Sequence, residues 1–162
     1  MFARTAPPPA AAPGADVTAR AVGALALAAL AVIHVVDLPA TLGPTPLVGL
    51  GYLGIVAAAV LIGGVLITRS HWLAWAAGGA VAVSAMGGYV LTRAVPGGFL
   101  GDHGDVGNWR CPLGISALSV ETLIILLAAG WGGWQLRARG GISLTAGLRP
   151  GARRAPEYSQ PR

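Results

Sequence analysis

The sequence has little charge and contains no lysine. Only 10% of its 162 residues are charged and 54% are hydrophobic, whereas about a quarter of the residues of a soluble domain are charged. This composition excludes an ordinary soluble domain and predicts a membrane protein. The formal net charge of +5 comes from eleven arginines, most of them in the N- and C-terminal regions. We therefore expect anionic lipid headgroups as partners of the C-terminal arginines, and no nucleic-acid partner.

Cysteine occurs once, as Cys111. A single cysteine excludes an intrachain disulfide, a CxxC redox pair and a cysteine-rich metal site. Two roles stay open for it, a thiolate ligand and a disulfide between two chains. The sequence also lacks the motif of a phosphate-binding loop and a recognisable nucleophile–base set, so it favours no enzyme class.

The hydrophobic residues are gathered in four runs that can cross a bilayer as helices. About 20 apolar residues, at 1.5 Å each, span a hydrocarbon core of ~30 Å. The runs predict helices at about residues 21–38, 46–67, 72–92 and 112–134, and hence an all-α transmembrane four-helix bundle over residues 20–134. Pro39 is expected to end the first helix, while Pro46 and Pro112 suit helix starts. Residues 1–19 and the arginine-rich residues 135–162 are predicted to be disordered tails.

The arginines are unequally divided between the two sides of the predicted bundle. The two tails and the turn at Arg69 hold nine of the eleven, and the opposite loops hold only Arg93 and Arg110. Loops rich in basic residues stay in the cytoplasm. We therefore predict a multi-pass protein of the plasma (inner) membrane with both termini cytoplasmic and the loop of residues 94–111 outside.

Two further patterns concern how the helices sit in the membrane. Trp72 and Trp75 open the third run, where tryptophan suits the membrane interface. Small residues recur every four positions, which lets helix backbones approach closely. This small-residue pattern comprises Ala74, Gly78 and Ala82 on the third run and Gly54 and Ala58 on the second. The pattern predicts tight packing within one chain, with a homodimer as the alternative.

Polar residues of all four predicted helices fall at one shallow depth below the outer surface. Counted along the helices, this layer contains His34, Asp37, Tyr52, Tyr89, Arg93 and Glu121. A carboxyl group inside a span costs about 2.5–3.5 kcal/mol at the centre and needs a partner or a proton. We expect Glu121 to pair with Arg93, His34 or both. The layer is then either a structural cluster that fixes helix order or a working site for proton exchange or a ligand.

A second polar group lies in the predicted outer loop. Asp102, His103 and Asp105 carry carboxylate and imidazole ligands that suit Zn or Cu, and His34 and Asp37 could join them from the first helix. Such a run among glycines is also typical of a solvated, turn-forming loop. A cofactor is therefore not required by the sequence, and a metal is the alternative.

Several short motifs together resemble a known group of proteins. They are YVLTR at 89–93, DVGNW at 105–109, PLG at 112–114, and the single residues His34 and Glu121. Residues 21–134 thereby resemble uncharacterised small four-span membrane proteins of actinobacteria. The resemblance implies a four-helix membrane fold and brings no assigned activity. It adds Trp109 to the candidate site residues, whereas Asp37 and His103 are not part of the family pattern, which often has an acidic residue where Cys111 stands.

The sequence therefore favours a non-enzymatic accessory or interaction protein with a polar cluster near the outer face. Its partner would be another membrane component or a second copy of the chain. One alternative is a small proton-linked transporter or membrane enzyme that uses Glu121 and His34. The other is an outer-face metal-binding protein. Against a transporter, the inner half of the predicted spans offers almost no polar residue for a path across the membrane.

Overall fold

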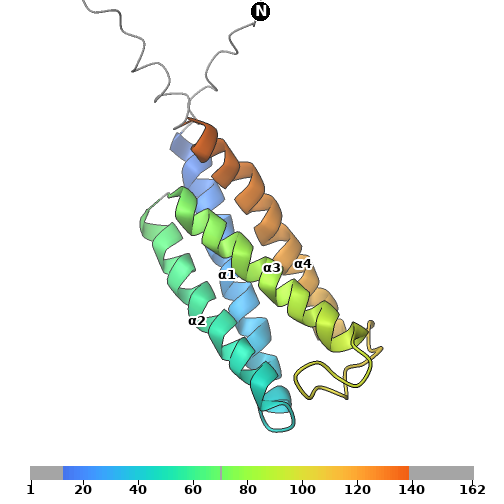
Figure 1. The fold of residues 1–162 in the computed structure, drawn as a ribbon. Coiled ribbons are helices and arrows are strands. Elements are labelled where there is room, and N and C mark those ends of the chain that lie inside the picture. The colour runs from blue at the N-terminus through green and yellow to red at the C-terminus, as the bar shows by residue number, and fades with distance from the viewer. Residues whose placement is uncertain (1–12, 70, 139–162) are drawn as a thin grey trace, which may run out of the picture.

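The computed structural model describes residues 13–69 and 71–138, and these form an antiparallel bundle of four long helices (Figure 1). The helices are α1 (Pro13–Leu42), α2 (Pro46–Thr68), α3 (Trp72–Ala94) and α4 (Pro112–Leu127). Each of the four described helices is long and apolar enough to cross a membrane, once α4 is taken to its end at Ala138. The described residues thus form an all-helical structure, and its four spans indicate a multi-pass integral membrane protein, as predicted.

The helices follow one another around the bundle, and the two ends of the bundle differ. α1 packs against α2 and α4, and α3 closes the ring against the same two helices. One end, which we call the loop end, carries the α1–α2 turn and the long α3–α4 loop. The other, the termini end, carries the start of α1, the α2–α3 turn and the end of α4 (Figure 1).

α1 is longer than the sequence predicted at both of its ends. It begins at Pro13, within the stretch that was expected to be a disordered tail. Proline suits the first turn, and Asp16 there favours the helix dipole. At the other end α1 passes through Pro39 to Leu42, although proline removes one backbone donor. The Thr41 hydroxyl donates to the Asp37 carbonyl at 3.0 Å, which supports the turn that follows.

α4 also continues beyond its predicted end. Ala128–Gly132 form a π-helical segment, η1, and residues 133–138 are helical again, so that the last predicted tail starts later than residue 135. Residues 135–138, Gln-Leu-Arg-Ala, are all good helix formers, which explains the extension. The rest of the two predicted tails, 1–12 and 139–162, lies outside the described residues.

The centre of the bundle is built largely from small residues. Ala74, Gly78 and Ala82 of α3 are all buried, so this part of the small-residue pattern serves packing within the chain. On α2 the prediction holds less well, because Gly54 is exposed and Ala58 is only half-buried, whereas the buried small residues are Gly49, Ala59 and Gly63. Spacing alone shows that small residues share a face but not which face turns inward.

Trp75, which was predicted to suit a membrane interface, is buried in the core of the bundle. Only 2% of it is exposed. A Cβ atom on Gly23 of α1 would lie 2.7 Å from the Trp75 ring, and one on Gly132 of η1 would lie 2.8 Å from the Trp75 Cβ. The indole therefore fills space that two glycines leave open. The π-helical turn brings Gly132 to this position, as wide turns often do where a helix must adapt locally.

Polar contacts close the termini end. Arg20 of α1 donates to the carbonyl of Leu66, at 2.7 Å, and to that of Ile67, so its charge lies at the C-terminus of α2. Asp16 lies 3.6 Å from Arg20 and accepts a hydrogen bond from the indole of Trp131 at 3.2 Å. α1, α2 and η1 are thus joined by polar contacts at this end.

Candidate ligand cavity

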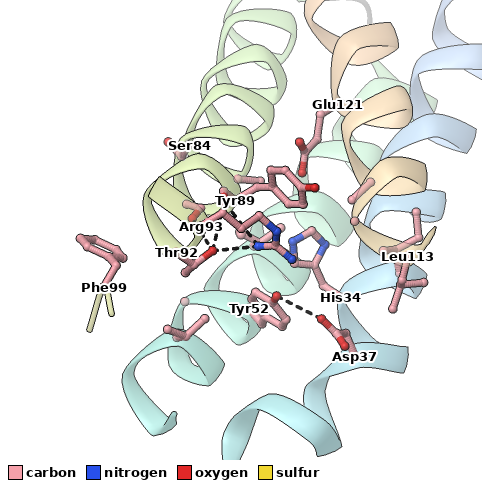
Figure 2. A pocket seen from close by; sticks show the side chains of 18 of the residues that line it. His34, Asp37, Tyr52, Ser84, Tyr89, Thr92, Arg93, Phe99, Leu113 and Glu121 are labelled. Carbon is pink, nitrogen blue, oxygen red and sulfur yellow. Dashed lines mark hydrogen bonds between the residues drawn. The ribbon is translucent and has the colours of Figure 1, made fainter. Parts of the chain in front are cut away.

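A cavity of about 280 Å³ lies between the four helices at the loop end. This volume is just below the ~300–1000 Å³ typical of small-molecule sites. Its wall is mostly apolar, and polar side chains reach it from every helix of the bundle (Figure 2). Six predicted members of the polar layer line it together: His34, Asp37, Tyr52, Tyr89, Arg93 and Glu121.

Glu121 is the buried acid of this cavity. It is 1% exposed, and its carboxyl group lies at the cavity wall (Figure 2). Among the described residues, its Oε2 atom has no hydrogen-bond partner and no ion pair reaches the carboxyl group. Burying a carboxylate without a partner costs several kcal/mol, roughly. The group therefore needs a proton, a hydrogen-bond donor or a positive charge, and the described protein supplies neither a donor nor a positive charge.

Arg93 does not supply that charge, contrary to the expected pairing. Its side chain turns toward the α3–α4 loop, where Nη2 lies 3.2 Å from Asp105 Oδ2 and Nε donates to the Asn108 carbonyl at 3.0 Å. Nη1 donates to the Thr92 hydroxyl at 2.8 Å. The guanidinium carbon also stacks 3.7 Å from the centre of the Tyr89 ring. Each arm of the guanidinium is thus engaged within the protein.

Tyr89 joins the loop to α3 and α4. Its hydroxyl donates to the Trp109 carbonyl at 3.1 Å, and the two rings meet edge to face with centroids 6.1 Å apart. Trp109 itself is not among the cavity-lining residues, so the structure gives it the role of holding Tyr89. The other edge of Tyr89 fits against Gly114, where a Cβ atom would lie 2.4 Å from Cε2. The motifs YVLTR, DVGNW and PLG therefore meet in one place.

The loop keeps its shape through backbone conformations that favour glycine. Gly98 has φ +88°, and a Cβ atom there would lie 2.7 Å from the Asp102 carbonyl oxygen. Gly107 has φ +78°, and its N–H donates to the Arg93 carbonyl at 3.0 Å. A residue with a side chain is strained at such φ values. The glycines thus allow the loop to fold back onto the end of α3.

His34 of α1 and Tyr52 of α2 form the part of the cavity wall that also includes Asp37. His34 is 6% exposed, and its Nδ1 atom lies 2.9 Å from the Leu30 carbonyl. A carbonyl only accepts, so Nδ1 carries a proton and Nε2 holds the lone pair in the neutral ring. Tyr52 packs edge to face on His34, with centroids 4.8 Å apart, and donates to Asp37 Oδ2 at 3.1 Å (Figure 2).

The three residues predicted as a metal site have different surroundings. Asp102 is buried, and its Oδ1 accepts the backbone N–H of Asp105 at 3.2 Å. Asp105 pairs with Arg93, and His103 is exposed. No group of three or more His, Cys, Asp or Glu side chains within residues 13–69 and 71–138 is arranged to hold a metal ion.

The core on the far side of Glu121 is apolar. Toward the termini end, Leu27, Leu30 and Ala82 are buried, together with Ile124, one turn after Glu121 on α4. The packed side chains of this region leave the polar groups of the cavity at one end of the bundle. The cavity thus lies on the loop-end side of this apolar core.

No protein-family model, curated protein or solved structure matches the chain.

Several lining residues were not in the predicted site. Phe99 and Leu100 of the loop lie against the cavity, and so do Ser84, Thr92 and Cys111. Thr92 and Cys111 adjoin predicted positions, so a search for helix-end residues at the same depth could have found them. Phe99 could not be found in this way, because its place depends on how the glycine-rich loop folds.

Proposed function

We propose that this chain is a non-enzymatic accessory protein of the membrane that binds a small molecule in the cavity at its loop end. One observation carries the proposal: Glu121 is almost completely buried, lines the cavity and has no partner among the described residues. A bound molecule that offers a donor or a positive charge would remove the cost of this burial. The site has the usual composition of a ligand pocket, an apolar wall with a few polar groups.

The cavity belongs to a firmly connected part of the molecule. Arg93 and Tyr89 tie the loop to α3 through contacts with Asp105, Asn108 and Trp109. Groups held in this way lose little further freedom when a ligand binds, which favours affinity. A preformed cavity of this kind supports recognition of a molecule more than it supports a large conformational cycle.

The proposed orientation places the loop end outside the cell. It is supported by the nine arginines assigned to the termini side against two on the loop side. In this arrangement the arginine-rich C-terminal region binds anionic headgroups of the cytoplasmic leaflet. The ligand reaches the cavity from outside or from the outer leaflet. The resemblance to four-span membrane proteins of actinobacteria fits a plasma-membrane location and is part of the same proposal.

Binding is favoured over proton-linked transport because of the core beyond Glu121. A transporter built on Glu121 and His34 would need a polar route to the termini end. In the described core, Leu27, Leu30 and Ile124 occupy this region. The geometry thus supports a cavity with access from one end.

The proposal is tested by native mass spectrometry of the full chain, purified in lipid nanodiscs from the membranes in which it was expressed. We expect a bound mass besides lipid in the wild type, lost in Glu121→Gln and kept in Thr122→Val. Thr122 is the matched control because it is the next residue of α4 and is exposed. If no mass is bound in the wild type, or the mass is equally present in Glu121→Gln, the proposed function is wrong.

A further inference from the structure

We propose that the ligand of the cavity is a small organic cation with an apolar body, such as a substituted ammonium ion, whose charge lies beside Glu121. This inference rests on the proposed function and adds the chemical class of the ligand. It follows from the charges around the cavity, from the hydrogen bonds of Arg93 and from the rings in the wall.

The first argument is the balance of charge. Among the described residues, Arg93 is the only arginine that lines the cavity, and Asp105 lies 3.2 Å from it, so their charges offset each other. Two acidic groups in the wall remain, Glu121 and Asp37, and no ion pair within the described residues reaches either of them. Among the described residues, the Asp37 carboxylate accepts a hydrogen bond from the hydroxyl of Tyr52 alone. The wall therefore holds two acidic groups without a positive partner among the described residues, and a cation would complement them.

The second argument excludes an anionic ligand. To bind an anion, Arg93 would have to release its present acceptors, because Nη2 contacts Asp105, Nε donates to the Asn108 carbonyl and Nη1 donates to the Thr92 hydroxyl. An anion would also lie in one small cavity with Glu121 and Asp37. Like charges brought together in a medium of low dielectric constant repel strongly.

The third argument comes from the apolar part of the wall. Tyr52, Tyr89 and Phe99 all line the cavity, and the faces of aromatic rings attract cations. Tyr89 already does so within the protein, since the Arg93 guanidinium lies 3.7 Å from the centre of its ring. An apolar body fits the remaining surface, and the volume of about 280 Å³ limits the ligand to a small molecule.

His34 does not replace the cation in this arrangement. Its Nδ1 proton is used by the Leu30 carbonyl at 2.9 Å, and no hydrogen bond joins its ring to Glu121 among the described residues. Nε2, with its lone pair, can accept a hydrogen bond from an ammonium N–H. Protonated amines would therefore gain one contact that quaternary ammonium ions lack.

The test compares three probes that share a benzyl group and have similar size: benzyltrimethylammonium, N-benzylacetamide and phenylmethanesulfonate. Their affinities for the full wild-type chain in nanodiscs of zwitterionic lipid are measured by isothermal titration calorimetry. We expect the cation to bind at least tenfold more tightly than the neutral amide and the anion not to bind. Zwitterionic lipid removes the attraction of the cation to anionic headgroups, and empty nanodiscs serve as the blank.

Two variants locate the charge that the probe recognises. Glu121→Gln keeps the shape of the side chain and is expected to weaken binding of the cation at least tenfold, and Thr122→Val is expected to leave it unchanged. The wild-type comparison of the three probes stands without any variant, so it remains decisive if a variant fails to fold.

The inference is overturned if the cation shows no saturable binding or if the amide or the anion binds as tightly as the cation. It is also overturned if Glu121→Gln, folded as judged by circular dichroism, binds the cation as tightly as the wild type. If native mass spectrometry nevertheless shows a bound mass that depends on Glu121, the proposed function, binding of a small molecule in the cavity, still holds. The two claims can thus fail separately.

Discussion

Arg93 Nη2 lies 3.2 Å from Asp105 Oδ2, and this ion pair joins the last turn of α3 to the loop that covers the cavity. Arg93 is buried and Asp105 is about one-third exposed, at 32% of its side chain. Arg93, which was expected to pair with Glu121, thus pairs with Asp105 instead. The direction of the Arg93 side chain therefore has two consequences. The loop is held against α3, and Glu121 remains available to a ligand.

The ion pair predicts a coupled effect on stability. Arg93→Ala leaves Asp105 and the Asn108 carbonyl without their donor, so we expect it to destabilise the protein more than Asp105→Ala does. In a double-mutant cycle measured by thermal unfolding in detergent, we expect a coupling of about 1–2 kcal/mol. In the matching cycle of Arg93→Ala with Glu121→Ala, additive losses are expected. Coupling to Glu121 instead of Asp105 would contradict the arrangement of the loop.

The close contact of Tyr89 with Gly114 gives a second prediction. In Gly114→Ala the new Cβ would lie 2.4 Å from Tyr89 Cε2, so the ring must move and release the Trp109 carbonyl. We expect a loss of roughly 1–3 kcal/mol, the usual cost of overpacking. Gly87→Ala in α3 is the control, because a Cβ atom there meets nothing within 4 Å. That control is expected to be neutral or slightly stabilising, and equal losses in the two variants would disprove the steric account.

The presence and approximate position of each membrane-spanning helix could be predicted from the sequence, because hydropathy and length decide whether a segment crosses a membrane. His34, Tyr52, Tyr89 and Glu121 could also be placed at one depth, since depth along a helix follows from a count of residues. That they line one cavity is shown by the structure. The end points were less predictable. Pro39 permitted a further turn of α1 because nearby side-chain and backbone hydrogen bonds support that turn.

The partner of Arg93 could not be predicted from depth. Arg93 lies at the level where its long side chain can turn inward or outward, and its direction depends on the fold of the loop. That fold in turn depends on glycines with positive φ, such as Gly98 and Gly107, and a sequence does not show which acceptors such a loop presents. The burial of Trp75 was missed for a related reason, since the space beside it is left by glycines of two other elements.

Topology is tested with the native cysteine. Cys111 lies at the loop end, between the loop and α4, so the proposed orientation makes it reactive toward a membrane-impermeant maleimide added to intact cells. Cys111→Ser is the blank, and a cysteine introduced at Ser159 in that background should react only after permeabilisation. Labelling of residue 159 in intact cells would show that the C-terminal region faces outside, which is the reverse of the proposed orientation.

The missing partner of Glu121 predicts that this residue lowers the stability of the empty protein. Glu121→Leu replaces a buried, unpartnered carboxyl with an apolar group of similar size. We expect the ligand-free variant to be as stable as the wild type or more stable, by about 1–3 kcal/mol, in thermal unfolding. This gain should come with loss of binding, as is common where a site is kept at the expense of stability. A marked loss of stability would instead show that Glu121 has a structural partner.

The rate of Cys111 alkylation tests the central claim most directly, because Cys111 and Glu121 line the same cavity. Benzyltrimethylammonium is added in increasing concentration to the full chain in nanodiscs, and the rate of reaction with a small maleimide is followed. We predict that the cation slows alkylation in a saturable way in the wild type and in Thr122→Val, and does not slow it in Glu121→Gln. An alkylation rate that is independent of the cation in the wild type, or that falls equally in Glu121→Gln, would contradict a cation site beside Glu121 in this cavity.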